Sequence, residues 1–326
     1  MSRVTVDDIA IVRVDRCPHC HGADVARWAE GVDFLLASSS RTYTYLRCRT
    51  CTVLFLATRP AEMSLGRIYP DEYTPYAPAA AKAASARRRP LVARVLMRLV
   101  DVPERRFRAR LERYYAGLGE GSIFLDFGCG AGAMLDRMRA QGCTTVGMDF
   151  SERALDTVRS KGHVALPAVP AAWDAVADSS VDFVRMNHVL EHLYHPADVL
   201  ERLRTKMRQG ARLHIAVPNP EGLSARLFRR HWHGLDCPRH VILFPPAVLA
   251  TWLDQLGFTT RRILHEPLYK DFIRSQARAW RRHEGADGAA LDELMSAPFR
   301  RVLAVLPVLA ATLAGFPDRF HVIAER

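Results

Sequence analysis

The chain has 326 residues, of which 49% are apolar and 25% are charged, so it can bury the core of two domains or one large one. No stretch reaches the roughly 20 apolar residues of a membrane-spanning helix, and we expect neither a membrane span nor a signal peptide. The net charge of +11 favours acidic partners such as nucleotides, phosphorylated compounds, nucleic acid or an anionic membrane face. An odd number of cysteines without an export signal argues against a disulfide framework, and we expect a cytoplasmic protein.

Four of the cysteines form two close pairs near the start of the chain. The first pair is Cys17 and Cys20, and the second is Cys48 and Cys51. Two such turns, about 27 residues apart, can close a tetrahedron of thiolates, which predicts a structural zinc site in a zinc ribbon. The first pair with His21 also matches a haem c attachment pattern, but the second pair and the lack of an export signal favour zinc. A redox site is disfavoured because the thioredoxin-like βαβ context is missing.

Three regions are predicted along the chain: a β-rich zinc ribbon over residues 1–60, a capping region over 61–118, and a larger domain over 119–326. Strands in the first region are expected at 33–36, 42–46 and 52–56. The capping region holds an aromatic loop with Tyr69, Tyr73 and Tyr76, a low-complexity linker, and basic amphipathic helices that break near Pro103. The tyrosines are candidates for a lid. The basic helices present a solvated face or, alternatively, a surface for phosphate or membrane.

The region from residue 119 alternates between apolar strands and helices, which predicts a parallel sheet covered on both faces. Strands are predicted near residues 122–127, 144–149, 163–166, 181–187, 211–217, 259–265 and 320–325. Helices are predicted near residues 131–141, 151–161, 197–208 and 246–256, with a helical insertion at about 267–317. The apolar segment 302–315 inside that insertion is expected in the core or as a substrate cap, and an interfacial helix near a lipid-linked substrate is the alternative.

A glycine-rich turn follows the first of these strands. Gly128 and Gly130 let the backbone approach a ligand, and the helix that follows offers free N–H groups. Asp126 ends the strand just before the glycines, and Asp149 ends the next strand, about 20 residues on, where a carboxylate can accept two ribose hydroxyls. A glycine loop by itself is weak evidence, because dinucleotide sites share it.

The region from about 120 to 265 resembles the class I S-adenosylmethionine-dependent methyltransferases. The matching segments are 125–132, 147–151 and 181–193. The resemblance implies an α/β fold, doubly wound around a mostly parallel seven-stranded sheet whose terminal strand is antiparallel. It also implies that Asp126, Gly128, Gly130 and Asp149 hold S-adenosylmethionine and that Asn187 lines its methionine part. One departure is that no acidic residue follows the third strand, so adenine is expected to rest on backbone and apolar contacts.

The segment after the fourth strand carries His188, Glu191 and His192, at the spacing of an inverted zinc-protease motif. Pro196 follows too closely for a long ligand helix, which argues against that reading. Some quinone-biosynthesis methyltransferases, which this segment resembles, carry Glu in place of His188 and are credited with a metal there, so a metal is left open. The alternative is that Glu191 and His192 brace the floor of the site.

The loop over 231–244 follows the fifth strand, at the edge where such sheets bind ligands. It resembles the corresponding loop of methyltransferases from polysaccharide and secondary-metabolite clusters, many of which carry an N-terminal zinc-binding domain. In the zinc-containing sugar C-methyltransferases a Glu-His pair stands here, with His as base, whereas this chain has Arg239 and His240. We expect His240 to be the catalytic base, Asp236 to hold its tautomer, Arg239 to orient an anionic acceptor, and His192 to be the reserve base. A histidine that only braces the loop is the alternative.

Together these features predict an S-adenosylmethionine-dependent methyltransferase with a zinc ribbon. The expected acceptor is a small molecule, such as a sugar, a glycolipid precursor or a related metabolite. One alternative is an rRNA or tRNA methyltransferase whose zinc ribbon binds RNA, and another is a non-catalytic binding protein with a decayed site. Peripheral contact with the inner membrane face is compatible with the charge.

Overall fold

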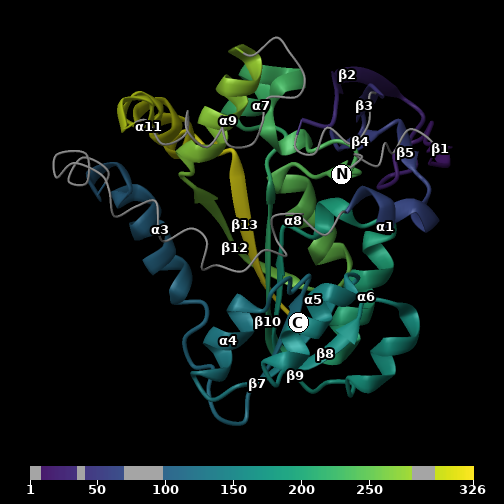
Figure 1. Cartoon of the computed structure of the whole chain (residues 1–326), viewed down its shortest axis with the longest axis vertical. Helices are drawn as coiled ribbons and strands as arrows, with labels where there is room; N and C mark the ends of the chain where they lie inside the picture. The colour runs from purple at the N-terminus through teal and green to yellow at the C-terminus, as the bar shows by residue number, and fades with distance from the viewer. Residues whose placement is uncertain (1–8, 35–40, 70–97, 281–297) are drawn as a thin grey trace, which may run out of the picture.

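A seven-stranded sheet forms the centre of the molecule in the computed structural model, which describes residues 9–34, 41–69, 98–280 and 298–326 (Figure 1). The order across the sheet is β12-β13-β10-β9-β6-β7-β8. The strands are β6 (Ile123–Phe127), β7 (Thr144–Asp149), β8 (Val164–Pro167), β9 (Val181–Asn187), β10 (Met207–Pro218), β12 (Thr259–Glu266) and β13 (Arg319–Glu325). Only β13 runs antiparallel to its neighbours, β10 and β12. The predicted α/β fold with a mostly parallel seven-stranded sheet is confirmed.

Helices cover both faces of this sheet. They are α3 (Val102–Glu112), α4 (Ala133–Arg139), α5 (Glu152–Ser160), α6 (Pro196–Lys206) and α8 (Pro246–Gln255). Successive side chains of the terminal strand point to opposite faces of the sheet. Ile323 packs with Phe107 of α3 on one face. Val322 lies in the main core with Leu249 and Leu253 of α8 on the other face. Pro103 lies in the first turn of α3, where its missing N–H costs nothing, so the predicted break at this proline is confirmed.

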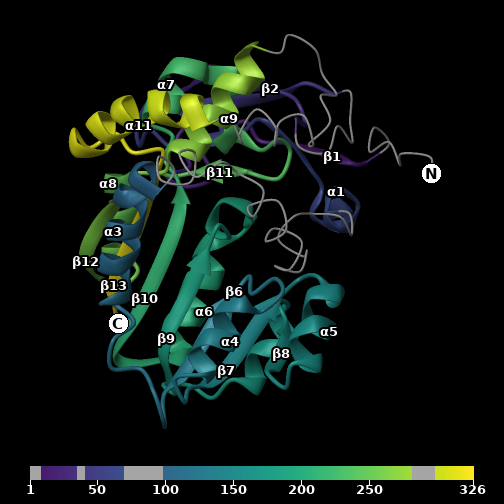
Figure 2. The same cartoon turned by 60° about the vertical axis from the view of Figure 1, so that its left-hand side comes forward.

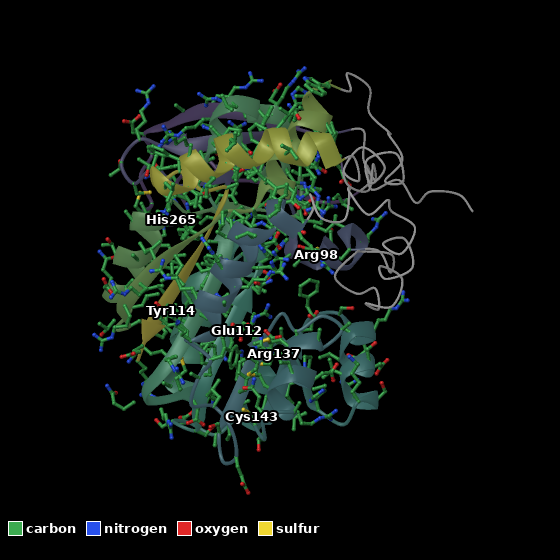
Figure 3. All side chains as sticks on the ribbon, turned by 90° about the vertical axis from the view of Figure 1, so that its left-hand side faces the viewer. Arg98, Glu112, Tyr114, Arg137, Cys143 and His265 are labelled. Carbon is green, nitrogen blue, oxygen red and sulfur yellow. The ribbon has the colours of Figure 1, made fainter. Side chains whose placement is uncertain are left out.

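Helix α3 is also tied to the cofactor-side half of the sheet. Arg137 of α4 points toward Glu112 near the end of α3, and the two side chains form an ion pair (Figure 3). Both side chains are 42% exposed, so the pair contributes little to stability. The ion pair links α3 to α4, the helix that directly follows the glycine-rich turn.

The N-terminal region forms two small sheets. The larger has the order β11-β4-β3-β2, and the smaller pairs β1 with β5. These strands are β1 (Ile11–Arg13), β2 (Val25–Gly31), β3 (Tyr43–Cys48), β4 (Leu54–Leu56), β5 (Thr58–Pro60) and β11 (Ile242–Leu243). The strand predicted at 33–36 is wrong for its described residues, because β2 ends at Gly31 and Asp33 is instead buried in an ion pair. Residues 35 and 36 lie outside the described part of the chain.

One strand of the N-terminal sheet comes from far along the chain. Strand β11 pairs antiparallel with β4, with Ile242 opposite Phe55 and Leu243 opposite Leu54. The loop predicted to carry the catalytic base therefore completes the sheet of the N-terminal region. The division of the chain at about residues 60 and 118 stays a prediction, since this pairing crosses it.

A layer of helices lies beyond the carboxyl ends of β9 and β10, next to the N-terminal sheets (Figure 2). It consists of α7 (Leu223–Phe228), α9 (Tyr269–Trp280) and α11 (Pro298–Leu313). The predicted helical insertion thus holds α9 and α11, with residues 281–297 outside the described part. Ala304 and Val308 of α11 pack on α9, whereas Leu306 and Leu313 are 73% and 82% exposed. No helix among the described residues is long and apolar enough to cross a membrane.

Six short helical segments connect the longer elements in the described part of the chain. They are η1 (Glu62–Ser64) with α1 (Leu65–Ile68), η5 (Pro170–Ala175), η6 (Leu190–His192), and the pair η7 (Arg229–His231) and η8 (His233–Leu235). The last pair matters most for function, because it joins the end of α7 to the predicted base.

Candidate functional site

A cavity of about 1150 Å³ lies at the carboxyl ends of the parallel strands. Its lining includes Asp126 and Asn187 at the ends of β6 and β9, and Pro218 at the end of β10. Ligand pockets usually measure about 300–1,000 Å³, so this cavity has room for a cofactor and a second molecule. Every residue predicted to contact the cofactor or act in catalysis lines it: Asp126, Gly128, Gly130, Asp149, Asn187, His192 and His240.

The glycine-rich turn leaves β6 with a backbone that only glycine adopts easily. Gly128 has φ +79°, and a Cβ there would lie 2.3 Å from the Val189 side chain. Gly128 N–H donates to the Met148 carbonyl at 2.7 Å, which anchors the turn to the neighbouring strand. A side chain at this position would both strain the turn and block its approach to the cavity.

Asp126 has a partner that the sequence did not suggest. Arg185 of β9 donates to both of its carboxylate oxygens, at 3.0 and 3.2 Å. Burial raises the pKa of Asp126, while the charge and hydrogen bonds of Arg185 oppose that rise. Arg185 keeps 20% of its side chain exposed and also lines the cavity, so the pair presents both charges to a ligand. An amino acid moiety carries both charges as well, and can match such a pair.

Asp149 ends β7 with both oxygens facing backbone donors. One oxygen accepts from Gly130 N–H at 2.9 Å and the other from Ser151 N–H at 2.9 Å. Burial raises the pKa of Asp149, and these hydrogen bonds limit the rise. Each carboxylate oxygen can accept a second hydrogen bond, so the group is oriented for hydroxyl donors in the cavity.

Beyond β8 the cavity wall is apolar. Ala168, Pro170 and Trp173 line it there, and Trp173 stacks on Phe127 with ring centroids 5.7 Å apart. These residues suit the expectation that adenine rests on apolar contacts.

His240 lies in the same cavity with its ring held at one nitrogen. Its Nδ1 is 2.7 Å from the Gly234 carbonyl, an acceptor, so Nδ1 carries the proton and Nε2 has a free lone pair. Nε2 lies 3.8 Å from Glu191 and 4.0 Å from Asp236, two carboxylates that would stabilise a positive charge on the ring. The side chain is 9% exposed. A histidine with one nitrogen fixed and the other free beside acids has the geometry of a general base.

His192 packs edge-on against His240, with ring centroids 4.6 Å apart. Burial, together with the nearby His240, lowers the pKa of His192 to about 4. Its Nδ1 contacts the Tyr69 hydroxyl at 2.8 Å and the Arg239 carbonyl at 3.1 Å. His192 is therefore neutral near pH 7 and a weaker base than an ordinary histidine. Of the other predicted lid residues, Tyr73 and Tyr76 lie outside the described part of the chain.

Glu191 lies beneath the two imidazoles. Burial opposes its ionisation, but a 3.1 Å contact with His188 Nδ1 and the nearby His240 and His192 outweigh burial and lower the pKa of Glu191 to about 2. Its second oxygen is buried without a hydrogen-bond partner among the described residues. Ligand atoms of Glu191, His192 and His240 all lie within 4.8 Å of one another, so a metal ion could also be held here. The other ring nitrogen of His188, Nε2, accepts from Arg319 at 2.9 Å.

The structure corrects two predicted roles beside His240. Arg239 does not face an acceptor, because its side chain is fully buried between Asp33 and Asp236, at 2.7 Å from each. Asp236 does not hold the His240 tautomer, because the Gly234 carbonyl occupies Nδ1. Instead the buried Arg239 pins the loop to residue 33 of the N-terminal region. Breaking such a pair would leave an uncompensated buried charge.

The N-terminal region holds the His240 loop at further points. The Tyr45 hydroxyl donates to the His240 carbonyl at 2.6 Å and also lies 2.7 Å from the Leu235 carbonyl. A Cβ on Gly31 would lie 2.6 Å from the Cys237 sulfur, so this glycine lets the loop pack directly on β2. Cys237 is thus an inert core residue, and burial raises the pKa of its thiol to about 12.

The four paired cysteines meet as predicted from their spacing. Cys17 Sγ lies 3.5 Å from Cys51 Sγ, and Cys20 Sγ lies 3.5 Å from Cys48 Sγ, with all four sulfurs within 4.8 Å of one another. None forms a disulfide. Zinc–sulfur bonds of about 2.3 Å at tetrahedral angles place sulfurs about 3.8 Å apart, so the cluster fits a zinc ion.

Comparison with known proteins identifies the larger domain. A family model described as "Methyltransferase domain" matches residues 98–263, just over half of the chain. The chain belongs to this methyltransferase domain family. The predicted class I S-adenosylmethionine-dependent methyltransferase fold is confirmed by this match together with the sheet order.

Individual relatives of this methyltransferase-domain protein are distant. An uncharacterized 37.1 kDa protein in a transposon of Streptomyces fradiae is 28% identical over 34% of this chain and 36% of its own length. A ubiquinone biosynthesis O-methyltransferase of Cupriavidus pinatubonensis is 31% identical over 32% of this chain and 44% of its own. The chain thus spans less than half the length of these two curated relatives. A solved S-adenosylmethionine-dependent methyltransferase from Archaeoglobus fulgidus is 21% identical, covering 67% of this chain and 92% of its own, with a TM-score of 0.45.

Three residues that build or support the site were not identified from the sequence: Asp33, Tyr45 and Arg185. Arg185 had a usable signal, since this charged residue stands between the apolar Val184 and Met186, two positions before the end of the strand. Asp33 and Tyr45 had none, because their partners lie about 200 residues away in the chain.

Proposed function

We propose that the protein transfers a methyl group from S-adenosylmethionine to a small-molecule acceptor, with His240 as general base. The main support for this proposal is that Nε2 of His240 and the glycine-rich turn line the same cavity. Curated relatives, among them the protein of Cupriavidus pinatubonensis described above, are named as ubiquinone biosynthesis O-methyltransferases, which supports a small acceptor. We infer from the resemblance of the loop that a sugar, a glycolipid precursor or a related metabolite is the acceptor.

When bound, S-adenosylmethionine supplies an electrophilic methyl group on a sulfonium centre. Asp149 would accept the ribose hydroxyls, and the turn at Gly128 and Gly130 would approach the cofactor with its backbone. Arg185 would bind the methionine carboxylate, with Asp126 holding Arg185 and accepting from the ammonium group. Asn187 would line the methionine part at the end of β9. These contacts would orient the methyl group of the cofactor toward the acceptor, and His240 would take the acceptor's proton at Nε2.

We also propose that Cys17, Cys20, Cys48 and Cys51 hold a structural zinc ion. Support comes from four sulfurs at near-tetrahedral spacing, two of them on fully buried residues. A site closed by four thiolates leaves no position for a substrate, so its role would be to fix the N-terminal sheets.

The proposed function is tested by incubating the protein and methyl-labelled S-adenosylmethionine with fractionated cell extract. Label in the small-molecule or glycan fraction is the expected result. Label in rRNA or tRNA would favour the RNA alternative instead. Cofactor binding without transfer to any fraction would favour a binding protein with a decayed site.

Cofactor binding should depend on Asp149. Replacing Asp149 by Asn removes the charge that two ribose hydroxyls would share, a loss of about 2–4 kcal/mol, or on the order of a hundredfold in affinity. Calorimetric titration with S-adenosylhomocysteine measures this. Asp156→Asn on the exposed face of α5 is the matched control and should leave affinity unchanged. Equal affinities in both variants would refute the ribose assignment.

A further inference from the structure

Two arginines of one helix lie in the cavity, and one of them is buried without a carboxylate partner among the described residues. Helix α9 directs Arg274 and Arg278, one turn apart, into the cavity that holds His240. Arg278 is only 7% exposed. Its one hydrogen bond among the described residues runs from Nη1 to the His233 carbonyl at 3.4 Å, and its guanidinium lies over the Phe34 ring at 5.2 Å. No carboxylate of the described residues lies within ion-pair distance of it.

The nearest carboxylates already have other partners. Asp271 is bound in a bidentate ion pair by Arg319, leaving only a 3.4 Å contact for Arg274. Asp236 is fully engaged by Arg239. Neither carboxylate is therefore available to form an ion pair with Arg278.

The pKa of Arg278 reflects its burial without a carboxylate partner. Burial lowers the pKa of Arg278 to about 10; the charge of Asp236 opposes this shift, and the nearby Arg274 and Arg239 add to it. It is still protonated at neutral pH. A buried cation without a carboxylate is costly unless a ligand supplies the missing charge. The neighbouring His233 adds no negative charge and is itself kept neutral, because burial and the arginines lower its pKa.

We propose that Arg274 and Arg278 bind an oxyanion group, a phosphate or a carboxylate, on the acceptor. Guanidinium groups present paired N–H donors that match both anions. We assign this subsite to the acceptor and not to the cofactor, since α9 packs on η8, the segment whose Gly234 carbonyl holds the His240 ring. Segment η8 also joins the subsite to the base: Arg278 contacts the carbonyl of His233, and His240 contacts the carbonyl of Gly234. An acceptor anchored at the arginines would thus present a nucleophile near His240. This inference rests on the proposed function.

The test is the binding of simple anions to the full-length protein loaded with S-adenosylhomocysteine, at constant ionic strength. Inorganic pyrophosphate and phosphate are the probes for a phosphorylated acceptor, and succinate and acetate are the probes for a carboxylate. Calorimetry or Trp232 fluorescence reports binding, since Trp232 lines the cavity. We expect one of the two classes to bind, and the class that binds more tightly identifies the anion. Failure of all four to bind would overturn the proposal.

Arg278→Met should weaken anion binding by about 10- to 100-fold, as expected for a lost charge-assisted hydrogen-bonded pair. Arg274→Met should weaken it less, because 33% of that side chain is exposed. Arg262→Met, which removes the same charge from an exposed position of β12 outside the cavity, is the matched control and should bind normally. Unchanged anion affinity in Arg278→Met would overturn the proposal.

A purely structural arginine would behave differently. Removing an uncompensated buried cation should hold or raise the melting temperature, whereas a structural role predicts a fall with no change in anion binding. If Arg278→Met does not fold, Arg278→Lys is the second variant, because it keeps the positive charge but loses the paired N–H donors of the guanidinium group. We expect Arg278→Lys to bind the anion with intermediate affinity. Binding as tight as in the native protein would contradict a role for the paired donors. Anion titration without S-adenosylhomocysteine separates this proposal from the cofactor assignment, because a failed cofactor site would leave anion binding intact.

Discussion

Replacing His240 by Ala is expected to lower the rate of methyl transfer by about 10²–10⁴-fold, the usual contribution of a general base. Affinity for S-adenosylmethionine should stay nearly unchanged, because no predicted cofactor ligand touches the imidazole. The reason lies in the ring's geometry: Nδ1 is fixed by the Gly234 carbonyl, and Nε2 is free in the cavity. Initial rates of label transfer into the extract fraction that accepts it provide the measurement.

Two additions make this result specific to a base. Added imidazole should restore part of the rate in His240→Ala, since the deleted ring leaves a space beside Glu191 and Asp236. His231→Ala removes a histidine from the same loop that does not line the cavity, and should retain native activity. A near-native rate in His240→Ala would make His240 a residue that only braces the loop.

His192→Ala and metal chelation separate the remaining roles. With its pKa lowered to about 4, His192 is expected to affect the rate mainly by orienting His240, so its loss should cost less than the loss of His240. If a chelator abolished activity while elemental analysis still found the metal of the paired cysteines, and a divalent cation restored activity, Glu191, His192 and His240 would act as metal ligands instead. If a chelator leaves the rate of methyl transfer unchanged, the role of His240 as a general base is supported.

The parallel sheet could be predicted because each strand has a local signal. The strands β6 and β9 are rich in apolar residues, each has a polar residue at or next to its carboxyl end, and helices follow at regular spacing. The same logic placed Asp126 and Asp149 together, since the carboxyl ends of parallel strands meet at one edge. The cysteine pairs likewise carry their partners in their spacing.

The support of the His240 loop could not be predicted. Tyr45 donates to the His240 carbonyl across 195 positions, and β11 pairs with β4 across almost as many. Arg239 was misassigned because a charged residue in a polar loop is usually exposed, and only the fold brings Asp33 to it. Single sequences carry no signal for contacts of this range.

Loss of the proposed zinc site should therefore damage catalysis as well as stability. Replacing Cys48 and Cys51 by Ser is expected to remove about one metal ion per chain and to lower the free energy of unfolding by about 5 kcal/mol, part of the ~10–16 kcal/mol that structural zinc contributes in zinc-finger peptides. Cys17 and Cys48 are fully buried in the main core, and His19 between the first pair packs on Phe244 and Trp252. Elemental analysis and denaturant unfolding measure the two effects.

The same double variant should lose methyl transfer by about tenfold or more while binding S-adenosylhomocysteine normally. The cysteines anchor β3, which carries Tyr45, and β4, which pairs with β11, so their loss should disturb the loop that holds His240. The glycine-rich turn belongs to the other sheet and should keep its structure. Cys143→Ser is the matched control: this buried cysteine lies at the amino end of β7, away from the paired cysteines, and should keep both metal and activity (Figure 3). A double variant that stayed fully folded and active without metal would show that the four thiols pack as ordinary core residues. Loss of metal and stability with full activity would instead uncouple the zinc region from the His240 loop, and Arg239 with Asp33 would then be sufficient to hold the base in place.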